Sequence, residues 1–143
     1  QIFKQCSADV YVVEQFSNFF SMKGISKKVR RMLSSWIRGI IDERLAFKAA
    51  THGLWIIHVP ASYSSQRCPF CGHVERGNRN KDKFNCCSCH HQAHSDANGA
   101  LNLLLAAHEP KIKKGLDRFA IKAIYRKEYE KYCKKNRITP IPA

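Results

Sequence analysis

Two Cys-x-x-Cys pairs constrain the fold of this chain more than any other feature. Cys68 and Cys71 form the first pair, and Cys86 and Cys89 form the second after the segment 72–85. Each turn presents two sulfurs at the separation that one tetrahedral Zn²⁺ requires, and four thiolates complete its shell. A redox-active dithiol would explain one such pair but not two. The sequence therefore predicts a closed, structural zinc site.

The cysteine count supports a metal site over a disulfide framework. Seven cysteines make an odd number, and paired spacing of this kind indicates a reducing compartment. Cys87 falls outside the x-x spacing and is a spare, while Cys6 and Cys133 are expected to be ordinary thiols. Because four thiolates fill the zinc shell, the nearby histidines are expected to contact nucleic acid or solvent. They are His73, His90, His91 and His94.

The charge balance indicates a polyanionic partner. Lys and Arg outnumber Asp and Glu by 25 to 11, which gives a net charge of +14. This surplus favours nucleic acid, although a merely basic solvated surface is the alternative. With no apolar run near the ~18 residues of a membrane span and no signal peptide, we expect no membrane partner and a cytoplasmic location, nucleoid-associated in a prokaryote. The candidate phosphate contacts are Lys27, Lys28, Arg30, Arg31, Arg67, Arg76, Arg79, Lys81 and Lys83.

The first third of the chain has a strand–helix–strand pattern. Residues 9–15 are β-branched and aromatic and predict a buried strand that carries Glu14 at its end. Apolar residues then recur at helical spacing from Ser26, a predicted N-cap, to Gly53, a predicted stop. In the apolar run 54–59, apolar and polar residues do not alternate, which predicts a strand covered on both faces, as in a parallel sheet. This order is a βαβ crossover and indicates an α/β fold.

Two further helices are predicted after the cysteine segment. Residues 96–107 form an apolar helical segment that opens with Asp96, and the basic tail from Lys111 is predicted to be helical over 116–135. Taken alone, Asp96 is most simply a helix N-cap and Glu14 an exposed carboxylate at a strand end. Taken together, carboxylates from separate elements are the groups that converge on Mg²⁺ in two-metal phosphodiester cleavage.

The order of these motifs resembles a known nuclease family. The chain reads Ser-Ser-Gln-Arg-Cys-Pro-Phe-Cys-Gly over residues 64–72, then the second pair, then Asp-Ala-Asn-Gly-Ala-Leu-Asn over 96–102. With the strand ending at Glu14 and the basic helix, this is similar to the C-terminal half of the RuvC-like domain in TnpB/OrfB proteins and type V CRISPR effectors. The resemblance covers about residues 8–106. Gly99 departs mildly from the family, which usually has Ala there.

The resemblance implies a fold and a set of catalytic residues. The fold is an RNase H-like (RuvC) fold in which a zinc ribbon interrupts the chain just before the last catalytic Asp. Glu14 then corresponds to the middle catalytic acid and Asp96 to the last, both as Mg²⁺ ligands. Asn98 and Asn102 shape the start of the last helix and pack it against the sheet. The implied division is 1–67 RuvC-like, 68–93 zinc ribbon, 94–107 final RuvC-like helix and 108–143 a basic tail that the family pattern does not explain.

One departure from the family is large. The family's first catalytic Asp lies on a first strand that this chain lacks, and the chain begins at Gln1 rather than Met. We therefore expect a second polypeptide or a missing N-terminal region to supply that Asp. The expected activity is guide-RNA-directed, Mg²⁺-dependent hydrolysis of DNA by the completed site. The alternatives are a catalytically inactive targeting module of the same family and an unrelated zinc-ribbon nucleic-acid-binding protein.

Overall fold

The computed structural model describes residues 8–15, 24, 26–113 and 115–141. The chain divides into two compact units, Gln1–His58 and Val59–Ala143. Each unit is α/β in content, and the boundary falls within the second long strand. None of the described helices combines the length and apolar content needed to cross a membrane.

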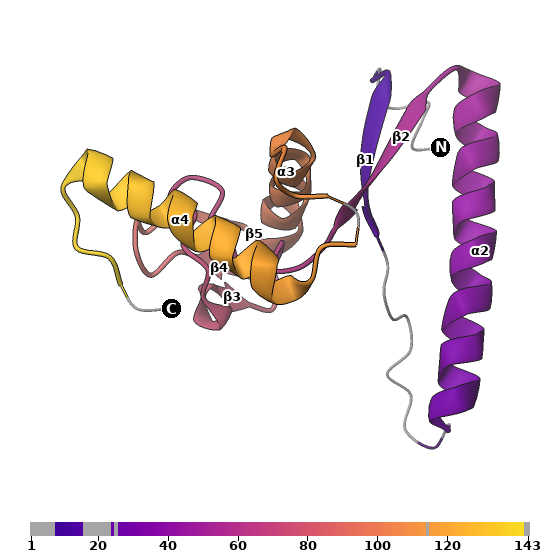
Figure 1. Ribbon diagram of the computed structural model, residues 1–143, viewed down its shortest axis with the longest axis horizontal. Helices are drawn as coiled ribbons and strands as arrows, with labels where there is room; N and C mark the ends of the chain where they lie inside the picture. The colour runs from indigo at the N-terminus through magenta and orange to yellow at the C-terminus, as the bar shows by residue number, and fades with distance from the viewer. Residues whose placement is uncertain (1–7, 16–23, 25, 114, 142–143) are drawn as a thin grey trace. The chain divides into compact units, whose positions relative to one another are not determined.

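The first unit is a strand–helix–strand crossover. Strand β1 spans Val10–Gln15, helix α2 spans Lys27–His52 and strand β2 spans Trp55–Pro60. The strands pair in a two-stranded sheet and run in the same direction, with α2 returning between them (Figure 1). The Trp55 N–H donates to the Asp9 carbonyl at 2.8 Å, which brings the two strand starts together. The predicted crossover is confirmed.

The ends of α2 are set by the residues that the sequence indicated. The Ser26 hydroxyl accepts a hydrogen bond from the Val29 N–H at 3.3 Å, satisfying one of the unpaired donors of the first turn. At the other end Gly53 adopts a left-handed conformation with φ of 67°, which glycine tolerates without a Cβ clash. Both predicted caps are therefore confirmed.

The predicted burial of the two strands is wrong. Most of β1 is only half-buried, and on β2 the side chains of Trp55 and Ile57 are 73% and 43% exposed. Those two residues lie on one face of β2, because side chains two apart in a strand point the same way. Within the described part of the first unit, α2 is the only helix, so it can cover one face of the sheet but not both.

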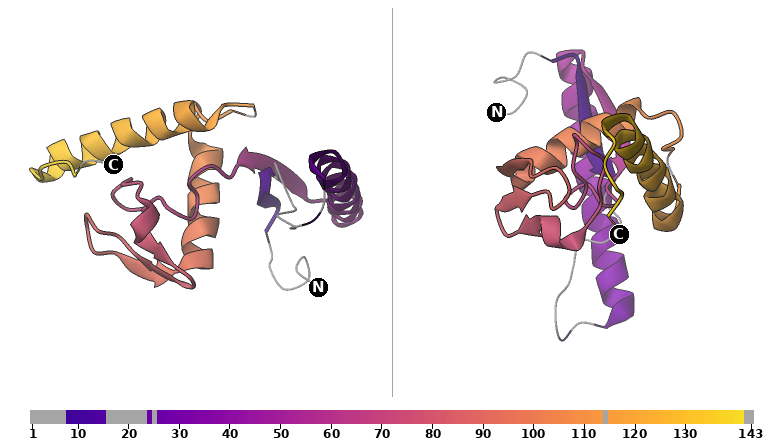
Figure 2. Two further views of the ribbon diagram at one scale, coloured as in Figure 1. Left: turned by 90° about the horizontal axis from the view of Figure 1, so that it is seen from below. Right: turned by 90° about the vertical axis from the view of Figure 1, so that its left-hand side faces the viewer.

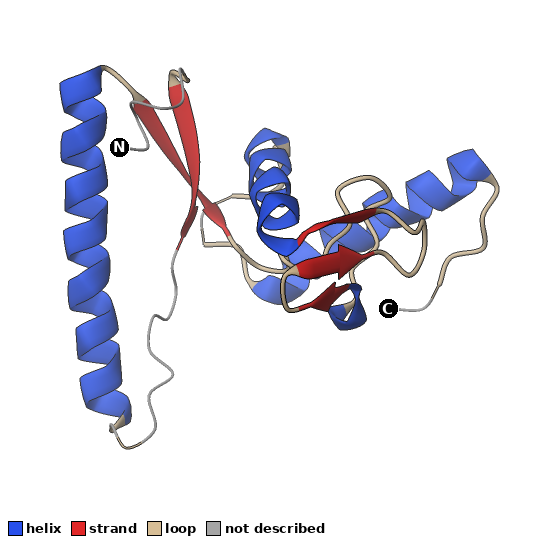
Figure 3. Ribbon diagram, turned by 180° about the vertical axis from the view of Figure 1, so that it is seen from behind, coloured by secondary structure: helices blue, strands red, loops and turns tan. Residues whose placement is uncertain are grey.

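The second unit is built around short strands and two helices (Figure 3). The strands form an antiparallel sheet in the order β3-β4-β5, in which Arg79 pairs with Phe84 and Phe84 with Ala93. Its elements are the 3₁₀ helix η1 (Arg76–Asn78), β3 (Arg79–Asn80), β4 (Lys83–Asn85), β5 (Gln92–His94), α3 (Ser95–His108) and α4 (Arg118–Asn136).

Helix α4 confirms that the basic tail is helical. The Asp117 side chain caps its start by accepting from the N–H groups of Phe119 and Ala120, and Arg137 ends it in a left-handed conformation. α4 runs crosswise to α3 (Figure 2), and its Tyr129 and Cys133 pack with the clustered cysteines. Its buried side chains recur at four-residue steps and so form one stripe, which packs toward the rest of the unit. They are Ile121, Tyr125, Tyr129 and Cys133.

Candidate metal centre

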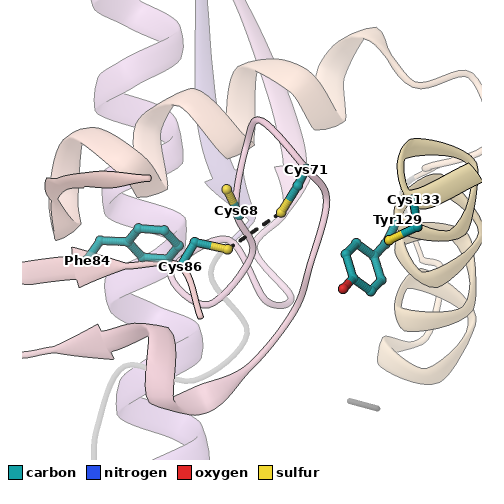
Figure 4. Close-up of a cluster of buried hydrophobic side chains, with 6 residues drawn as sticks. All are labelled: Cys68, Cys71, Phe84, Cys86, Tyr129 and Cys133. Carbon is teal, nitrogen blue, oxygen red and sulfur yellow. Dashed lines mark hydrogen bonds between the residues drawn. The ribbon is translucent and has the colours of Figure 1, made fainter. Parts of the chain in front are cut away.

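The four paired cysteines converge in the second unit, and Figure 4 shows three of them, Cys68, Cys71 and Cys86. Their sulfurs all lie within 4.8 Å of one another. The Cys68 and Cys89 sulfurs are 3.5 Å apart, as are those of Cys71 and Cys86, so each close contact joins one pair to the other. Four sulfurs bound at ~2.3 Å around a tetrahedral Zn²⁺ lie about 3.8 Å apart, which is close to this spacing. The cluster could therefore hold one zinc ion.

The two cysteine turns have the same backbone geometry. In the first turn, the Cys68 N–H donates to the His73 carbonyl and the Gly72 N–H donates to the Cys68 carbonyl. In the second turn, the Cys86 N–H donates to the His91 carbonyl and the His90 N–H donates to the Cys86 carbonyl. The residue after the second cysteine of each pair is left-handed, with φ of 82° at Gly72 and 58° at His90. This repeated turn aims both sulfurs of each pair toward one point.

The thiols influence one another strongly. Hydrogen bonds with the sulfurs of Cys68 and Cys86, together with burial, raise the pKa of Cys71. Hydrogen bonds from Cys68 and Cys71 lower the pKa of Cys86. Four thiolates this close would repel one another, so without a cation the sulfurs retain protons that they share through hydrogen bonds. A divalent cation would stabilise the fully deprotonated cluster.

A shell of buried side chains covers the cluster. Phe84 from β4 and Tyr129 and Cys133 from α4 form one buried group with the cysteines (Figure 4). The His73 N–H also points at the Cys71 sulfur at 3.5 Å. Cys133, predicted to be an ordinary thiol, is thus a core side chain beside the cluster, whereas Cys6 lies outside the described residues. Ligand sets are usually oriented by such outer contacts.

Tyr129 is the residue that the sequence prediction missed. Its hydroxyl bonds to the Ser88 hydroxyl at 3.0 Å and accepts from the Ile141 N–H at 3.0 Å. Its ring meets His73 edge-on, with centroids 4.8 Å apart. The sequence did contain a pattern that could have identified Tyr129. Apolar and aromatic side chains recur every four residues along α4, and this spacing predicts a buried helical stripe.

Of the other residues around the cysteines, His73 differs from its prediction and Cys87 agrees with it. His73 is buried, with its Nδ1 3.6 Å from the Cys87 sulfur, so the expectation that it contacts nucleic acid or solvent is wrong. The His91 ring packs on Phe70 with centroids 4.3 Å apart. Cys87 is exposed and outside the four-sulfur cluster, as a spare cysteine should be.

Asp96 lies in the first turn of α3, directly after the ribbon. The N-cap of α3 is His94, whose Nδ1 accepts from the Asp96 N–H at 3.3 Å, so the simpler prediction that Asp96 is itself the cap is wrong. The Asp96 side chain is 78% exposed, and its nearest cation is Arg79 at 3.6 Å. The carboxylate therefore keeps oxygens open to solvent at the positive end of a helix.

The α3 start is fixed to the ribbon by hydrogen bonds. The Ser95 N–H donates to the Asp82 carbonyl at 2.8 Å, which joins the helix to the β3–β4 turn. The Asn98 amide donates to the Arg67 carbonyl at 3.1 Å. The Asn102 amide donates to the carbonyls of Ser64 and Arg67 at 2.8 and 2.7 Å. Both asparagines are buried and hold α3 against the segment that leads into the first cysteine pair.

Arg67 does not fit its predicted role as a phosphate contact. Its side chain is buried, and its guanidinium donates to Asn102 at 2.9 Å and pairs with Glu128 at 2.7 Å. It also lies over the Tyr125 ring, 4.5 Å from the centroid. Since buried charges require this kind of pairing, Arg67 acts as an internal tie between the first cysteine turn, α3 and α4.

The other predicted phosphate contacts remain accessible. The residues on and before the β3–β4 hairpin are exposed, as are three of the four on α2, while Arg30 is half-buried. They are Arg76, Arg79, Lys81 and Lys83 on the ribbon and Lys27, Lys28 and Arg31 on α2. Glu14 is half-buried on β1 of the first unit, and Asp96 belongs to the second. Their convergence on one metal site stays a prediction.

Comparison with known proteins identifies the matched region. Residues 39–103 match the family model described as Cas12f1-like, TNB domain. The chain is 40% identical over 86 residues to InsQ of Escherichia coli K12, which is named as an RNA-guided DNA endonuclease; the match covers 54% of this chain and 21% of InsQ. The resemblance to TnpB-type and type V effector proteins is confirmed.

Other relatives of the same kind support this result. Cas12f1 of Sulfoacidibacillus thermotolerans, a CRISPR-associated endodeoxyribonuclease, is 33% identical over 76 residues, covering 52% of this chain and 18% of the relative. A TnpB-like protein of Aquifex aeolicus is 30% identical over 96 residues, covering 65% of this chain and 31% of that protein. The chain thus spans no more than about a third of the TnpB-type relatives it matches.

One solved structure of a type V effector is also similar. It is a cryo-EM structure of CasPhi-2 (Cas12j) bound to crRNA, with a TM-score of 0.44 and 28% identity over 72% of this chain and 17% of that one. A TM-score at this level is too low to support the RuvC fold. The Cas12f1-like match ends at residue 103, before α4 begins, so the packing of α4 on the cysteine turns lies beyond it.

Proposed function

We propose that this chain is part of an RNA-guided DNA endonuclease of the TnpB and type V effector kind. In this proposal it supplies the C-terminal part of a RuvC-like domain, with a zinc ribbon and two of three catalytic carboxylates. The observation that carries the proposal is the direct attachment of an exposed carboxylate, Asp96, to a four-cysteine ribbon of the Cas12f1-like kind.

The four cysteines hold a structural zinc ion. They fill all four tetrahedral positions, so no site is left for a substrate or a reactive water. The ion stabilises the two cysteine turns, and through them the short strands and the start of α3. The Ser95–Asp82 hydrogen bond then fixes where the helix begins, and with it the position of Asp96.

Glu14 and Asp96 are the proposed Mg²⁺ ligands. Carboxylate oxygens are what Mg²⁺ prefers, and Asp96 has oxygens that are exposed and only loosely paired with Arg79. When bound, Mg²⁺ would activate water and stabilise the leaving oxygen in phosphodiester hydrolysis. The first catalytic Asp is proposed to come from a second polypeptide or from a further region of the same protein.

DNA and a guide RNA are the proposed partners. Arg79, one of the exposed cations of the β3–β4 hairpin, contacts the Asp96 carboxylate at 3.6 Å. Phosphates drawn to these cations would reach the carboxylate without sequence preference, because phosphate contacts carry no base code. Choice of target then rests on pairing between guide and DNA.

The decisive experiment is cleavage by the complete assembly that contains this chain, with Mg²⁺ present. Asp96→Asn should abolish cutting of a guide-matched DNA, because it removes a ligand charge without changing side-chain volume. Asp82→Asn is the matched control: Asp82 is also an exposed Asp beside the start of α3, but only its backbone carbonyl is used there. Its cleavage should equal that of the unmodified protein.

The outcomes separate the proposal from its alternatives. Cutting that survives Asp96→Asn would remove Asp96 from the active site. Guide-dependent binding with no cutting by the unmodified assembly would instead support the inactive targeting module. The unrelated zinc-ribbon protein loses its basis, because the TnpB-type and type V resemblance is confirmed.

A further inference from the structure

A pocket lies between the first cysteine turn and α4, away from Asp96. It has a volume of about 410 Å³, within the range of small-ligand sites. Gly72, His73 and Val74 form one side, α4 forms the other, and Pro140 and Ile141 complete the lining. Because α4 lies outside the Cas12f1-like match, only the side of the pocket formed by the first cysteine turn falls within the matched residues.

The lining combines aromatic and cationic side chains. Phe119 borders the pocket with 75% of its surface exposed, although a large apolar ring would ordinarily be covered. Tyr129 contributes a second ring. Lys122 and Arg126 lie on the same helix face; Arg126 pairs with Glu130 at 3.2 Å, while Lys122 has no ion pair with a described residue.

His73, one of the lining residues, also carries an unsatisfied ring nitrogen. His73 is 1% exposed, and its Nε2 has no hydrogen-bond partner among the described residues. Its other ring nitrogen is already engaged by the Cys87 sulfur. A buried polar atom without a partner is costly. This nitrogen has less than 1 Å² of accessible surface, so a ligand would reach it only after the ring or its cover moves.

We infer that this pocket binds one unstacked nucleobase of a single-stranded nucleic acid. The base would stack on Phe119, and the adjoining phosphates would lie by Lys122 and Arg126. Aromatic stacking beside a positively charged track is the usual way in which proteins hold single strands. Helix α4 supplies that track, with seven Lys or Arg against two Glu over Arg118–Asn136.

The inference rests on the proposed role of the chain in binding nucleic acid. It can nevertheless be tested without catalysis, using the zinc-loaded 143-residue chain in the absence of Mg²⁺. Fluorescence anisotropy would measure the affinity for short oligothymidylate, for oligouridylate and for an abasic strand of equal length. The abasic strand keeps the phosphates but offers no base to stack.

Two variants probe the pocket itself. Phe119→Leu removes the stacking ring, and Ala123→Leu places a larger side chain in the lining at an exposed helix position. Each should bind base-containing strands roughly five- to a hundredfold more weakly, with abasic binding unchanged. The matched control is Phe47→Leu, since Phe47 is also an exposed helical Phe, at 60%, but lies on α2.

The results identify the strand and can overturn the inference. A larger loss of affinity for oligothymidylate would identify DNA as the source of the base, and a larger loss for oligouridylate would identify RNA. Equal losses would indicate a pocket that stacks on the base without distinguishing the two strands. Equal binding of base-containing and abasic strands, no strand binding at all, or a Phe119→Leu variant that matches Phe47→Leu would each overturn it. Failure of the Asp96→Asn cleavage test would leave these binding results intact, so the two proposals fail separately.

Discussion

The Arg67 guanidinium lies 2.7 Å from a Glu128 carboxylate oxygen, and this contact joins the residue before the first clustered cysteine to the middle of α4. The same guanidinium bonds to Asn102 on α3. One side chain therefore connects the first cysteine turn to both helices of the second unit. A charge buried in this way is stabilised only while its partners stay in place.

Replacing Arg67 should destabilise the second unit severely. Arg67→Met leaves Glu128 and Asn102 without their partner, and loss of one member of a buried ion pair costs about 3–5 kcal/mol. Urea unfolding of the zinc-loaded chain measures the effect. Arg126→Met is the control, because its pair with Glu130 is exposed and should contribute only ~0.3–0.5 kcal/mol. Equal losses in both variants would contradict an internal role for Arg67.

Glu128 should give the second unit a measurable pH dependence. Burial raises the pKa of Glu128 above its ordinary value of 4.5, and Arg67 offsets this only in part. Between 4.5 and the raised value, the folded chain binds more protons than the unfolded chain, so the free energy of unfolding increases as pH falls through that window.

The difference between two variants isolates this effect from zinc loss at low pH. Glu128→Gln should remove the Glu128 contribution to the slope of unfolding free energy against pH, whereas Glu130→Gln should keep it. Both are glutamates on the same helix. If both variants follow the unmodified chain across the window, Glu128 does not titrate as described.

Loss of one clustered cysteine should abolish zinc binding. Cys71→Ser removes one of the four sulfurs, and we expect the second unit to lose its zinc and its cooperative unfolding, as small zinc-dependent domains do. Cys87→Ser removes an exposed sulfur outside the cluster and should retain one zinc per chain. Zinc content of the purified protein together with near-ultraviolet circular dichroism gives the result. A full complement of zinc in Cys71→Ser would exclude the four-cysteine site.

Gly72 should not tolerate a side chain. Its φ of 82° is strained for alanine by about 1–2 kcal/mol, and an added Cβ would lie 3.3 Å from the Tyr129 backbone nitrogen. Gly72→Ala should therefore lower the thermal midpoint and weaken the packing of α4. Gly77→Ala provides the comparison, since its Cβ would meet only the Glu75 side chain at 3.9 Å. His90→Gly, at the equivalent position of the second turn, should be neutral or stabilising, because glycine accepts the left-handed conformation.

The sequence by itself determined the local elements and which cysteines cluster. Ser26 and Gly53 marked both ends of α2, because a capping hydroxyl and a left-handed glycine act within one turn of the helix. The Cys-x-x-Cys spacing likewise predicted which sulfurs would meet. These features depend on residues a few positions apart, so no knowledge of the rest of the fold was required.

Tertiary structure decided which side chains became interior. Arg67 was predicted to contact phosphate, but Glu128, some sixty residues away, provides an internal partner. His73 and Tyr129 of the α4 stripe cover each other. Trp55 and Ile57 stay exposed because the described part of the first unit has one helix for its sheet. Burial depends on contacts between distant segments, and those contacts form only when the whole unit has packed.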